Sequence, residues 1–426
     1  MDEREDSRLR EFRQLKNEIR GSKEYLIVGI DIAKERHYAF FGTATGKTVL
    51  KRLVFENNIE GFKRLLMQVG ALKVQHSLKK IVIGLEPTGD YHKPLGEHLI
   101  NCGYQVVLVS GVAVKRNREL LDGRWDKHDV KDSANVADLI SQGKCLYYEY
   151  PSLGLRDLRN LLSLKRRLKK EEQRYRVRIR NHLLAQYFPE LDGYYGSRES
   201  EAIVRWCLDP SRIAGLEGEQ FGRLIGVSAK RVVQQQRLRA IRQEAVNSIG
   251  CEVGQSVAFE ARMMVEKLNE LREAIRATDA KIKEICLQFP EYQYLLSIPG
   301  FGPDISSTVL GAIGDPFRFD SSKQVLKMGG LDLSADRSGK TSDTATPVIS
   351  KKGKAGLRYA LYQAAFIAST KNRYFIVYYT NTLKGREREQ GIKTKMRIKL
   401  AAKLLIMAWA LMKKKESFNP GHLNLR

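Results

Sequence analysis

The sequence has little that would cross a membrane, form disulfides or bind zinc. Its five cysteines are scattered without CxxC spacing, which argues against a disulfide framework and a zinc site and favours a reducing compartment. The most apolar stretch, residues 400–412, is interrupted by Lys403 and is too short to span a bilayer. Residues 1–20 lack an apolar core, so we expect no signal peptide. These absences predict a cytoplasmic protein with no membrane partner.

Acidic residues are few relative to basic ones. The chain has 74 Lys and Arg against 49 Asp and Glu, a formal net charge of +25. Such a surplus favours a polyanionic partner, because phosphates release counterions when Lys and Arg neutralise them. The alternative is a merely basic, solvated surface. A chain of 426 residues is too long for one ordinary core, so we expect two or three domains.

Residues 25–34, YLIVGIDIAK, form an apolar run with Asp31 near its end. The run predicts a buried strand, and a buried carboxylate is costly unless it is paired or holds a metal. Residues 37–56 indicate two more strands. Ribonuclease-H-like nucleases begin in this way, and so does the sugar-kinase and actin group. The second group would need glycine-rich phosphate loops, for which residues 44–47 are a poor candidate, and no Walker pattern occurs.

More acids follow at the ends of later elements. A second apolar run ends at Glu86, and its alternation with helices predicts an α/β sheet with some parallel pairing. Asp129 and Asp132 share one face of a predicted helix. Asp126 and Asp129 have the same spacing, so spacing alone does not choose the pair. The alternative to metal binding is an exposed helix whose first turn is acidic. Carboxylates from separate elements of one α/β unit are what two Mg²⁺ (or Mn²⁺) ions need for phosphodiester chemistry.

From about residue 151 the chain changes to long helices. Residues 156–180 predict a basic helix with one apolar seam, on which Lys165, Arg166 and Arg167 are candidate phosphate contacts. Residues 264–285 carry a heptad pattern. A coiled coil between two chains and a hairpin within one chain both fit this pattern, because periodicity does not identify the partner.

The last part of the chain offers two candidate phosphate sites. In residues 294–315 a Pro-Gly-x-Gly-Pro hairpin separates two helices, so the amides of Gly300 and Gly302 could grip a phosphate; ordinary helix packing is the alternative. A polar loop after residue 333 places several serines beside basic residues, and a serine so placed could attack a phosphodiester, although a phosphate-binding loop is the simpler interpretation. The basic residues are Arg337, Lys340, Lys351, Lys352, Lys354 and Arg358.

The motifs resemble a known family. GIDIAK at 29–34, GLEPTG at 84–89 and KHDVKDSANVADLI at 127–140 resemble the RuvC-like half of the DEDD transposases of bacterial insertion sequences, which include the pilin-gene inversion recombinases. SIPGFGPDISSTVLGAIGD, GGLDL, RSGK and ISKKGKAGLRYAL resemble the family's C-terminal transposase domain. The resemblance covers residues from about 25 to 410.

The resemblance implies an α/β plus α architecture. We expect a RuvC-like, ribonuclease-H-like domain at 25–150, a helical coiled-coil region at 151–288, and a mostly helical transposase domain with a helix-hairpin-helix-like element at 289–426. Residues 1–24 are expected to be a charged extension, either a solvated helix or a disordered arm, without an assigned function.

The resemblance also implies the site. The family's Lys-x-Asp-x-x-Asp motif falls on Lys127, Asp129 and Asp132, which leaves Asp126 outside, and Ser133 stands where the family usually has Ala. Together with Asp31 and Glu86 these two aspartates would be metal ligands and catalytic residues.

The family's catalytic serine falls on Ser338, and a shift of the alignment would move this role to Ser334 or Ser342. The implied activity is a DNA transposase or recombinase that cuts and rejoins donor and target DNA through a phosphoserine, in a composite site between subunits of a dimer or tetramer.

A structured bridge RNA would supply the sequence specificity, and the protein would work at the bacterial or archaeal nucleoid. The alternatives are a RuvC-like endonuclease that uses water and a catalytically inactive nucleic-acid scaffold.

Overall fold

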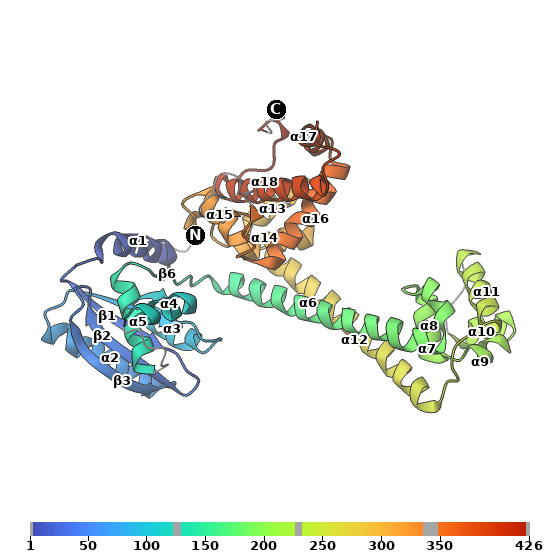
Figure 1. Ribbon diagram of the computed structural model, residues 1–426, viewed down its shortest axis with the longest axis horizontal. Coiled ribbons are helices and arrows are strands. Elements are labelled where there is room, and N and C mark those ends of the chain that lie inside the picture. The colour runs from blue at the N-terminus through green and yellow to red at the C-terminus, as the bar shows by residue number, and fades with distance from the viewer. Residues whose placement is uncertain (1–2, 122–128, 226–231, 335–347, 423–426) are drawn as a thin grey trace. The chain divides into compact units, whose positions relative to one another are not determined.

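The computed structural model describes residues 3–121, 129–225, 232–334 and 348–422 (Figure 1). The chain divides into two units, Met1–Ser152 and Leu153–Arg426. Within the described ranges, no helix combines the length and the apolar character that crossing a membrane would require.

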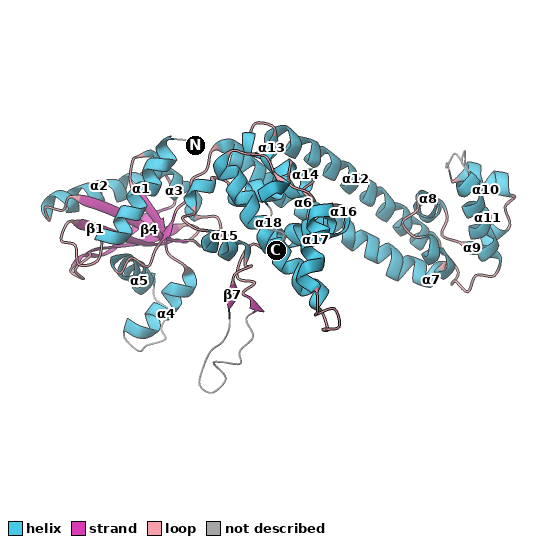
Figure 2. Ribbon diagram, turned by 90° about the horizontal axis from the view of Figure 1, so that it is seen from above, coloured by secondary structure: helices cyan, strands magenta, loops and turns pink. Residues whose placement is uncertain are grey.

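The first unit is built on a six-stranded mixed sheet, whose strands are magenta in Figure 2. The strand order is β3-β2-β1-β4-β5-β6. The pairs β1–β4 and β4–β5 are parallel, and the other three pairs are antiparallel. The strands are β1 (Tyr25–Asp31), β2 (Arg36–Thr43), β3 (Thr48–Glu56), β4 (Lys80–Glu86), β5 (Gln105–Leu108) and β6 (Leu146–Tyr147).

Helices cover both faces of this sheet. Leu26, Val28 and Ile30 of β1 share one core with α2 (Ile59–Gln75) and α3 (His92–Asn101). Tyr25 and Ile27 share the other core with α4 (Gly111–Leu121) and α5 (Asp129–Ser141). Side chains alternate between the faces of a strand, so Gly29 and Asp31 belong to the α5 face.

The N-terminal residues differ from the expected solvated or disordered arm. They form helix α1 (Glu3–Glu18), on which Leu9 is 5% and Leu15 1% exposed, and Ile19 just after the helix is fully buried. Leu15 and Ile19 lie in the same core as Ile27 of β1. The helix therefore belongs to the first unit. Its apolar positions are few and are separated by charged residues, which is why the sequence pattern did not reveal the packed face.

The second unit contains a long helical hairpin, seen in both views (Figures 1 and 2). Helices α6 (Leu153–Arg178) and α12 (Gln255–Cys286) pack against each other within one chain. Ion pairs link Lys165 to Asp279 and Arg178 to Glu260, and this opposite order of residue numbers shows that the helices are antiparallel.

The predicted heptad seam of α12 is its buried face, which includes Leu268, Ile275 and Ile282. The hairpin within one chain is thus the arrangement that the structure shows, and coiled-coil pairing between chains stays a prediction.

A group of short helices lies between the two arms of the hairpin in sequence. They share a core that includes Phe188, Phe221 and Ile241. These elements are η1 (Ile179–Leu184, π-helical), α7 (Ala185–Tyr187), η2 (Pro189–Tyr194), α8 (Arg198–Trp206), α9 (Pro210–Ala214), α10 (Gly218–Leu224) and α11 (Val232–Val246).

The C-terminal residues form a helical bundle with one small two-stranded ribbon. Its core is rich in alanine on α16 and α18, which lets these helices approach closely. Residues 400–412, the most apolar stretch of the sequence, lie in α18. The elements are α13 (Pro290–Leu296), α14 (Pro303–Ile313), η3 (Pro316–Arg318), α15 (Ser322–Gly329), β7 (Leu333–Ser334), β8 (Val348–Ile349), α16 (Ala355–Lys371), α17 (Arg373–Leu383), α18 (Ile392–Lys414) and η5 (Pro420–His422).

Candidate active site

Asp31 and Glu86 are direct neighbours at the ends of the two central strands. Asp31 is the last residue of β1, Glu86 is the last residue of β4, and the two are paired in the parallel register. Register partners in a parallel pair lie roughly 4.8 Å apart and point to the same face of the sheet. Both residues are partly exposed. The structure therefore brings together these two predicted acids.

Two glycines allow helix α5 to lie directly on these strands. Gly29 and Gly84 are also register partners, two residues before the acids. A Cβ on Gly29 would lie 2.2 Å from the Ser133 carbonyl oxygen, and a Cβ on Gly84 would lie 2.1 Å from Ile140 Cδ1. A side chain at Gly29 would meet backbone atoms and push the helix off the sheet, whereas one at Gly84 would displace the Ile140 side chain.

The direction of α5 places its first turns toward the acids. Its last residue, Ser141, and Gln142 just after it line a cavity with Gly21, which precedes β1. Ser133, near the other end of the helix, lies over Gly29. The helix therefore runs antiparallel to β1, so its N-terminal residues lie toward the end of β1 that carries Asp31.

Asp132 is buried, with 2% of its surface exposed. Its carboxylate forms an ion pair with Arg118 of α4, whose side chain is 18% exposed. A buried carboxylate needs such a cation, because removing it from water without a partner costs several kcal/mol. Asp129 is the first residue of α5, one turn before Asp132.

The start of α4 lies beside Glu86. A Cβ on Gly111, the first residue of α4, would lie 2.8 Å from Glu86 Oε1. The amino end of a helix favours a carboxylate, because the unpaired amides of its first turn carry partial positive charge. Helix α4 thus contacts two of the predicted acids, Glu86 with its first residue and Asp132 through Arg118.

The described residues supply some of the ligands that a divalent cation needs. Carboxylate oxygens are the hard ligands that Mg²⁺ prefers, and Asp31 and Glu86 present them side by side. No group of three or more His, Cys, Asp or Glu side chains close enough to hold a metal occurs among the described side chains, which do not include that of Asp129. Lys127 and Asp126 lie outside the described residues.

The predicted serine loop lies mostly outside the described residues too. Ser338 and Ser342 belong to the range 335–347, as do Arg337 and Lys340. Strands β7 and β8 flank this range and pair antiparallel, with Ser334 opposite Val348. The ribbon therefore brings together Ser334 and Val348, the residues on either side of this range. Ser334 itself is exposed on β7.

Lys165 has internal partners, which differs from the role that the sequence suggests. It is only 8% exposed and its ammonium pairs with Asp279 of α12 and, at 2.7 Å, with Asp304 of α14. Burial by itself lowers the pKa of Lys165, but hydrogen bonds to the two carboxylates outweigh it and raise the pKa above its ordinary value. Lys165 thus ties α6 to α12 and α14, while its neighbours Arg166 and Arg167 are exposed.

Of the basic residues around the start of α16, two have internal partners and two are exposed. Arg358 donates to the carbonyl oxygens of Gly329 and Gly353 at 3.1 and 3.0 Å, and Lys354 donates to that of Ala312 at 3.1 Å. These two residues hold the base of the β7–β8 ribbon. Lys351 and Lys352 are exposed.

The two glycines of the predicted hairpin have different surroundings. A Cβ on Gly300 would lie 2.5 Å from the Ala364 carbonyl oxygen of α16, and the residue has a φ of +89°. Helix packing, the alternative considered from sequence, accounts for this glycine. Gly302 precedes α14 with open space around it, but Asp304 in the first turn places a carboxylate beside any phosphate bound there.

Two parts of the chain match known protein families. Residues 28–189 match a family described as "Transposase", the DEDD transposases of the IS110 type, and residues 292–380 match "Transposase IS116/IS110/IS902 family". Together the matches cover more than half of the chain. They identify it as a transposase, a class that acts on DNA. The chain belongs to the DEDD-type insertion-sequence transposases of the IS110/IS116/IS902 family.

Two curated relatives span almost the whole chain. The insertion element IS110 uncharacterized 43.6 kDa protein of Streptomyces coelicolor is 25% identical over 401 residues, which is 91% of this chain and 94% of that protein. The insertion element IS116 uncharacterized 44.8 kDa protein of Streptomyces clavuligerus is 22% identical over 403 residues, 92% of this chain and 96% of that protein.

Sequence reasoning missed Arg118 and the paired role of Gly29 and Gly84. Each glycine interrupts an apolar strand two residues before an acid, and that repeated spacing was the signal for a helix packed closely on the sheet. Arg118 carried no signal, because one arginine among several in residues 115–124 has no distinguishing pattern.

Proposed function

We propose that this protein cuts and rejoins donor and target DNA through a covalent bond to Ser338, assisted by a divalent metal held by Asp31, Glu86, Asp129 and Asp132. The observation that carries the proposal is the register pairing of Asp31 with Glu86 on the sheet face that α5 covers. The family membership supports the DNA substrate.

Each residue has a defined part in this reaction. The Ser338 oxygen forms a bond to the scissile phosphorus, the bond from phosphorus to the leaving DNA oxygen breaks, and the hydroxyl proton is transferred to that leaving oxygen. Rejoining is the reverse step with the hydroxyl of a different DNA strand. A divalent metal held by the predicted acids would supply positive charge to stabilise the phosphate oxygens. Arg118 pairs with the Asp132 carboxylate, which orients one predicted ligand.

Guidance by a structured bridge RNA is the second part of the proposal. The net charge of +25 supports a protein that holds RNA and DNA together through backbone contacts. Exposed Arg166, Arg167, Lys351 and Lys352 are the described residues that suit such contacts best. Base pairing by the RNA would then carry the sequence specificity.

Metal binding tests the role of the acids. Calorimetric titration of the purified protein with Mn²⁺ should show binding that Asp31→Asn and Glu86→Gln each weaken at least about 10-fold. The matched control is Asp90→Asn, four residues beyond Glu86, which removes an 84% exposed carboxylate paired with Lys93. If all three variants bind Mn²⁺ as the wild type does, these acids are not metal ligands.

A metal-dependent endonuclease that uses water is the alternative, since the same acids would serve it. The two functions differ in the fate of the cut DNA end. A nuclease releases it free, whereas the proposed reaction leaves it attached to the protein.

A further inference from the structure

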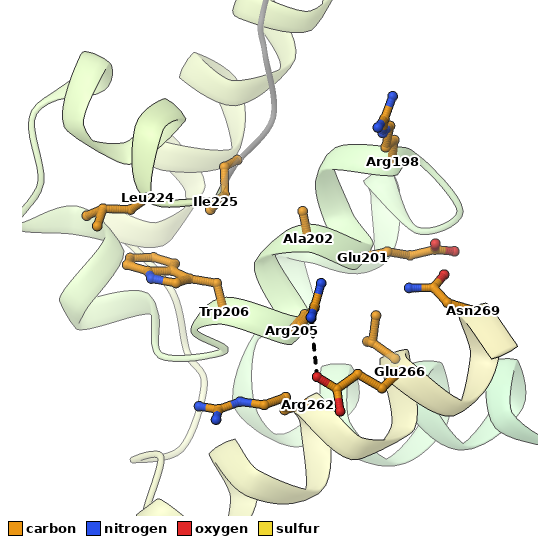
Figure 3. A pocket seen from close by; sticks show the side chains of 11 residues that line it. Arg198, Glu201, Ala202, Arg205, Trp206, Leu224, Ile225, Arg262, Glu266 and Asn269 are labelled. Carbon is orange, nitrogen blue, oxygen red and sulfur yellow. Dashed lines mark hydrogen bonds and ion pairs between the residues drawn. The ribbon is translucent and has the colours of Figure 1, made fainter.

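The short helices between α6 and α12 enclose a cleft that neither family match reaches. The cleft has a volume of about 710 Å³ and is lined by residues of α8, of the α10 end and of α12 (Figure 3). The matched ranges end at residue 189 and resume at residue 292. A cleft of this size lies within the roughly 300–1,000 Å³ range of sites that hold small ligands or single nucleotides.

The charges that line the cleft favour an anion. Arg198, Arg205 and Arg262 line it together with two carboxylates, those of Glu201 and Glu266. Both carboxylates already have cationic partners. Glu201 accepts two hydrogen bonds from Arg272, at 2.5 and 2.7 Å.

Glu266 pairs with Arg205 at 3.3 Å, drawn as a dashed line in Figure 3. Arg198 and Arg262 are exposed, and in the described part of the chain neither has an ion pair or hydrogen bond to another side chain. Two guanidinium groups, one at each end of the cleft (Figure 3), therefore remain to bind phosphates.

The cleft also has an aromatic wall. Trp206, the last residue of α8, lines it beside Leu224 and Ile225 (Figure 3). Phe221 lies 6.3 Å from the Trp206 ring, and the Arg212 guanidinium carbon lies 5.4 Å from the ring centroid. These contacts fix the orientation of the indole. A fixed aromatic ring beside free arginines is the combination that binds unpaired nucleotides, because a base stacks on the ring while its phosphate meets a guanidinium.

We infer that this cleft binds an unpaired nucleotide of a single-stranded segment of nucleic acid, with its base against Trp206 and its phosphate at Arg262. Arg198, at the opposite end of the cleft, suits the phosphate of a neighbouring nucleotide of the same strand (Figure 3). The inference rests on the proposed nucleic-acid function and assigns one part of that binding to a specific place. Base pairs of a duplex cannot stack on Trp206 in this way, so the cleft discriminates against double-stranded DNA.

Binding by full-length protein with Ser338→Ala, in EDTA, tests the inference without any strand cleavage. The probes are fluorescein-labelled oligouridylate, oligothymidylate and a DNA duplex of equal length. Trp206→Ala should weaken binding of the single strands by about 5- to 100-fold, the range expected for losing one stacked base. Trp206→Phe, which keeps an aromatic ring, should retain affinity within about threefold. Duplex binding should change by less than about twofold.

Arg262→Ala provides an independent variant, because an exposed arginine can be removed without disturbing the core. It should weaken single-strand binding and lower the slope of log affinity against log salt by about 1, as expected for one lost phosphate contact. Its matched control is Arg239→Ala, an exposed arginine on α11 that does not line the cleft. Phe259→Ala, which removes a 63% exposed aromatic side chain on α12, is the control for Trp206.

The outcomes separate clearly. The inference is supported if Trp206→Ala and Arg262→Ala weaken single-strand binding and the two controls do not. A larger loss of affinity for oligouridylate than for oligothymidylate assigns the cleft to RNA. Equal losses for the two oligonucleotides assign it to any single strand. Wild-type affinity in both cleft variants, or equal loss of duplex and single-strand binding, overturns it. If Trp206→Ala does not fold, the comparison of Arg262→Ala with Arg239→Ala still decides. Failure here leaves the serine chemistry untouched, since that chemistry is measured separately by a protein–DNA adduct.

Discussion

Gly29 and Gly84 lie opposite each other in the parallel pair β1–β4, and helix α5 rests on both. Their missing side chains allow the Ser133 carbonyl and the Ile140 side chain to reach the sheet. Two residues further along each strand lie Asp31 and Glu86. The glycine pair therefore determines how closely the helix with Asp129 and Asp132 approaches the strands that carry the other two acids.

Gly29→Ala should separate this helix from the sheet. The new Cβ would meet backbone atoms of α5, 2.2 Å from the Ser133 oxygen, so the helix has to move and we expect a loss of about 1–3 kcal/mol in the free energy of unfolding. Chemical denaturation measures it. The matched control is Gly70→Ala on α2, where a Cβ meets nothing within 4 Å and we expect a gain of up to about 1 kcal/mol. Equal effects of the two changes would contradict the close packing.

Arg118→Met should destabilise the first unit by leaving the Asp132 carboxylate buried without a cation. Asp132 has a side chain only 4% exposed, so we expect a cost of about 3 kcal/mol in the free energy of unfolding. The double variant Arg118→Met, Asp132→Asn removes the charge as well and should recover part of the loss. Strictly additive effects in this double-mutant cycle would show that the two residues do not interact.

Lys165 and its neighbours should have separable roles. Lys165→Met breaks the link to Asp279 and Asp304, and because both carboxylates can rehydrate, the expected cost is only about 1–2 kcal/mol in unfolding free energy. Arg166→Ala and Arg167→Ala should leave stability unchanged but weaken DNA binding and lower its salt dependence. A Lys165→Met protein of wild-type stability with a large loss in DNA affinity would reverse this assignment.

The Lys165 link also predicts a dependence of stability on pH. Because its pKa in the folded protein is raised above the ordinary 10.5, its contribution is fully present below pH 10.5 and is lost as the pH rises through the raised pKa. The difference in unfolding free energy between wild type and Lys165→Met should therefore be constant from neutral pH to about pH 10 and shrink above it. A difference that shrinks already below neutral pH would point to another group.

The cysteines should divide into two reactivity classes. Cys102 and Cys251 are exposed, whereas Cys145, Cys207 and Cys286 are buried. Burial raises the pKa of Cys145 to about 11 and that of Cys286 to about 12, so their thiols stay protonated and unreactive at neutral pH. In a colorimetric thiol titration of the native protein, two cysteines should react quickly with the reagent. The remaining three should react only after denaturation. Fast reaction of Cys286 in the native state would contradict the packing of α12.

Much of the architecture could be predicted from sequence, because it follows from local patterns. The apolar runs that end at Asp31 and Glu86 are strands, and the heptad positions Leu268, Ile275 and Ile282 are the buried face of α12. These elements depend on periodicity within one segment, which the sequence records directly. The packed face of α1 was missed because its apolar residues are too few to form a clear period.

The partners of charged residues could not be predicted in the same way. Lys165 looks like the arginines beside it in sequence, and only the approach of α12 and α14 makes it a buried ion-pair residue. Arg118 and Asp132 come together because α4 packs on α5. Such contacts depend on tertiary packing, and spacing along the chain carries no information about them.

The most direct test of the proposed chemistry is a search for DNA covalently attached to the protein. Wild-type protein, its guide RNA, Mg²⁺ and end-labelled donor DNA should give an adduct that survives denaturation in detergent. The adduct should be absent in Ser338→Ala and in Asp31→Asn and should persist in Ser334→Ala and Ser342→Ala. Free cleaved ends without an adduct, with Ser338→Ala as active as wild type, would contradict the phosphoserine mechanism and favour a nuclease that uses water.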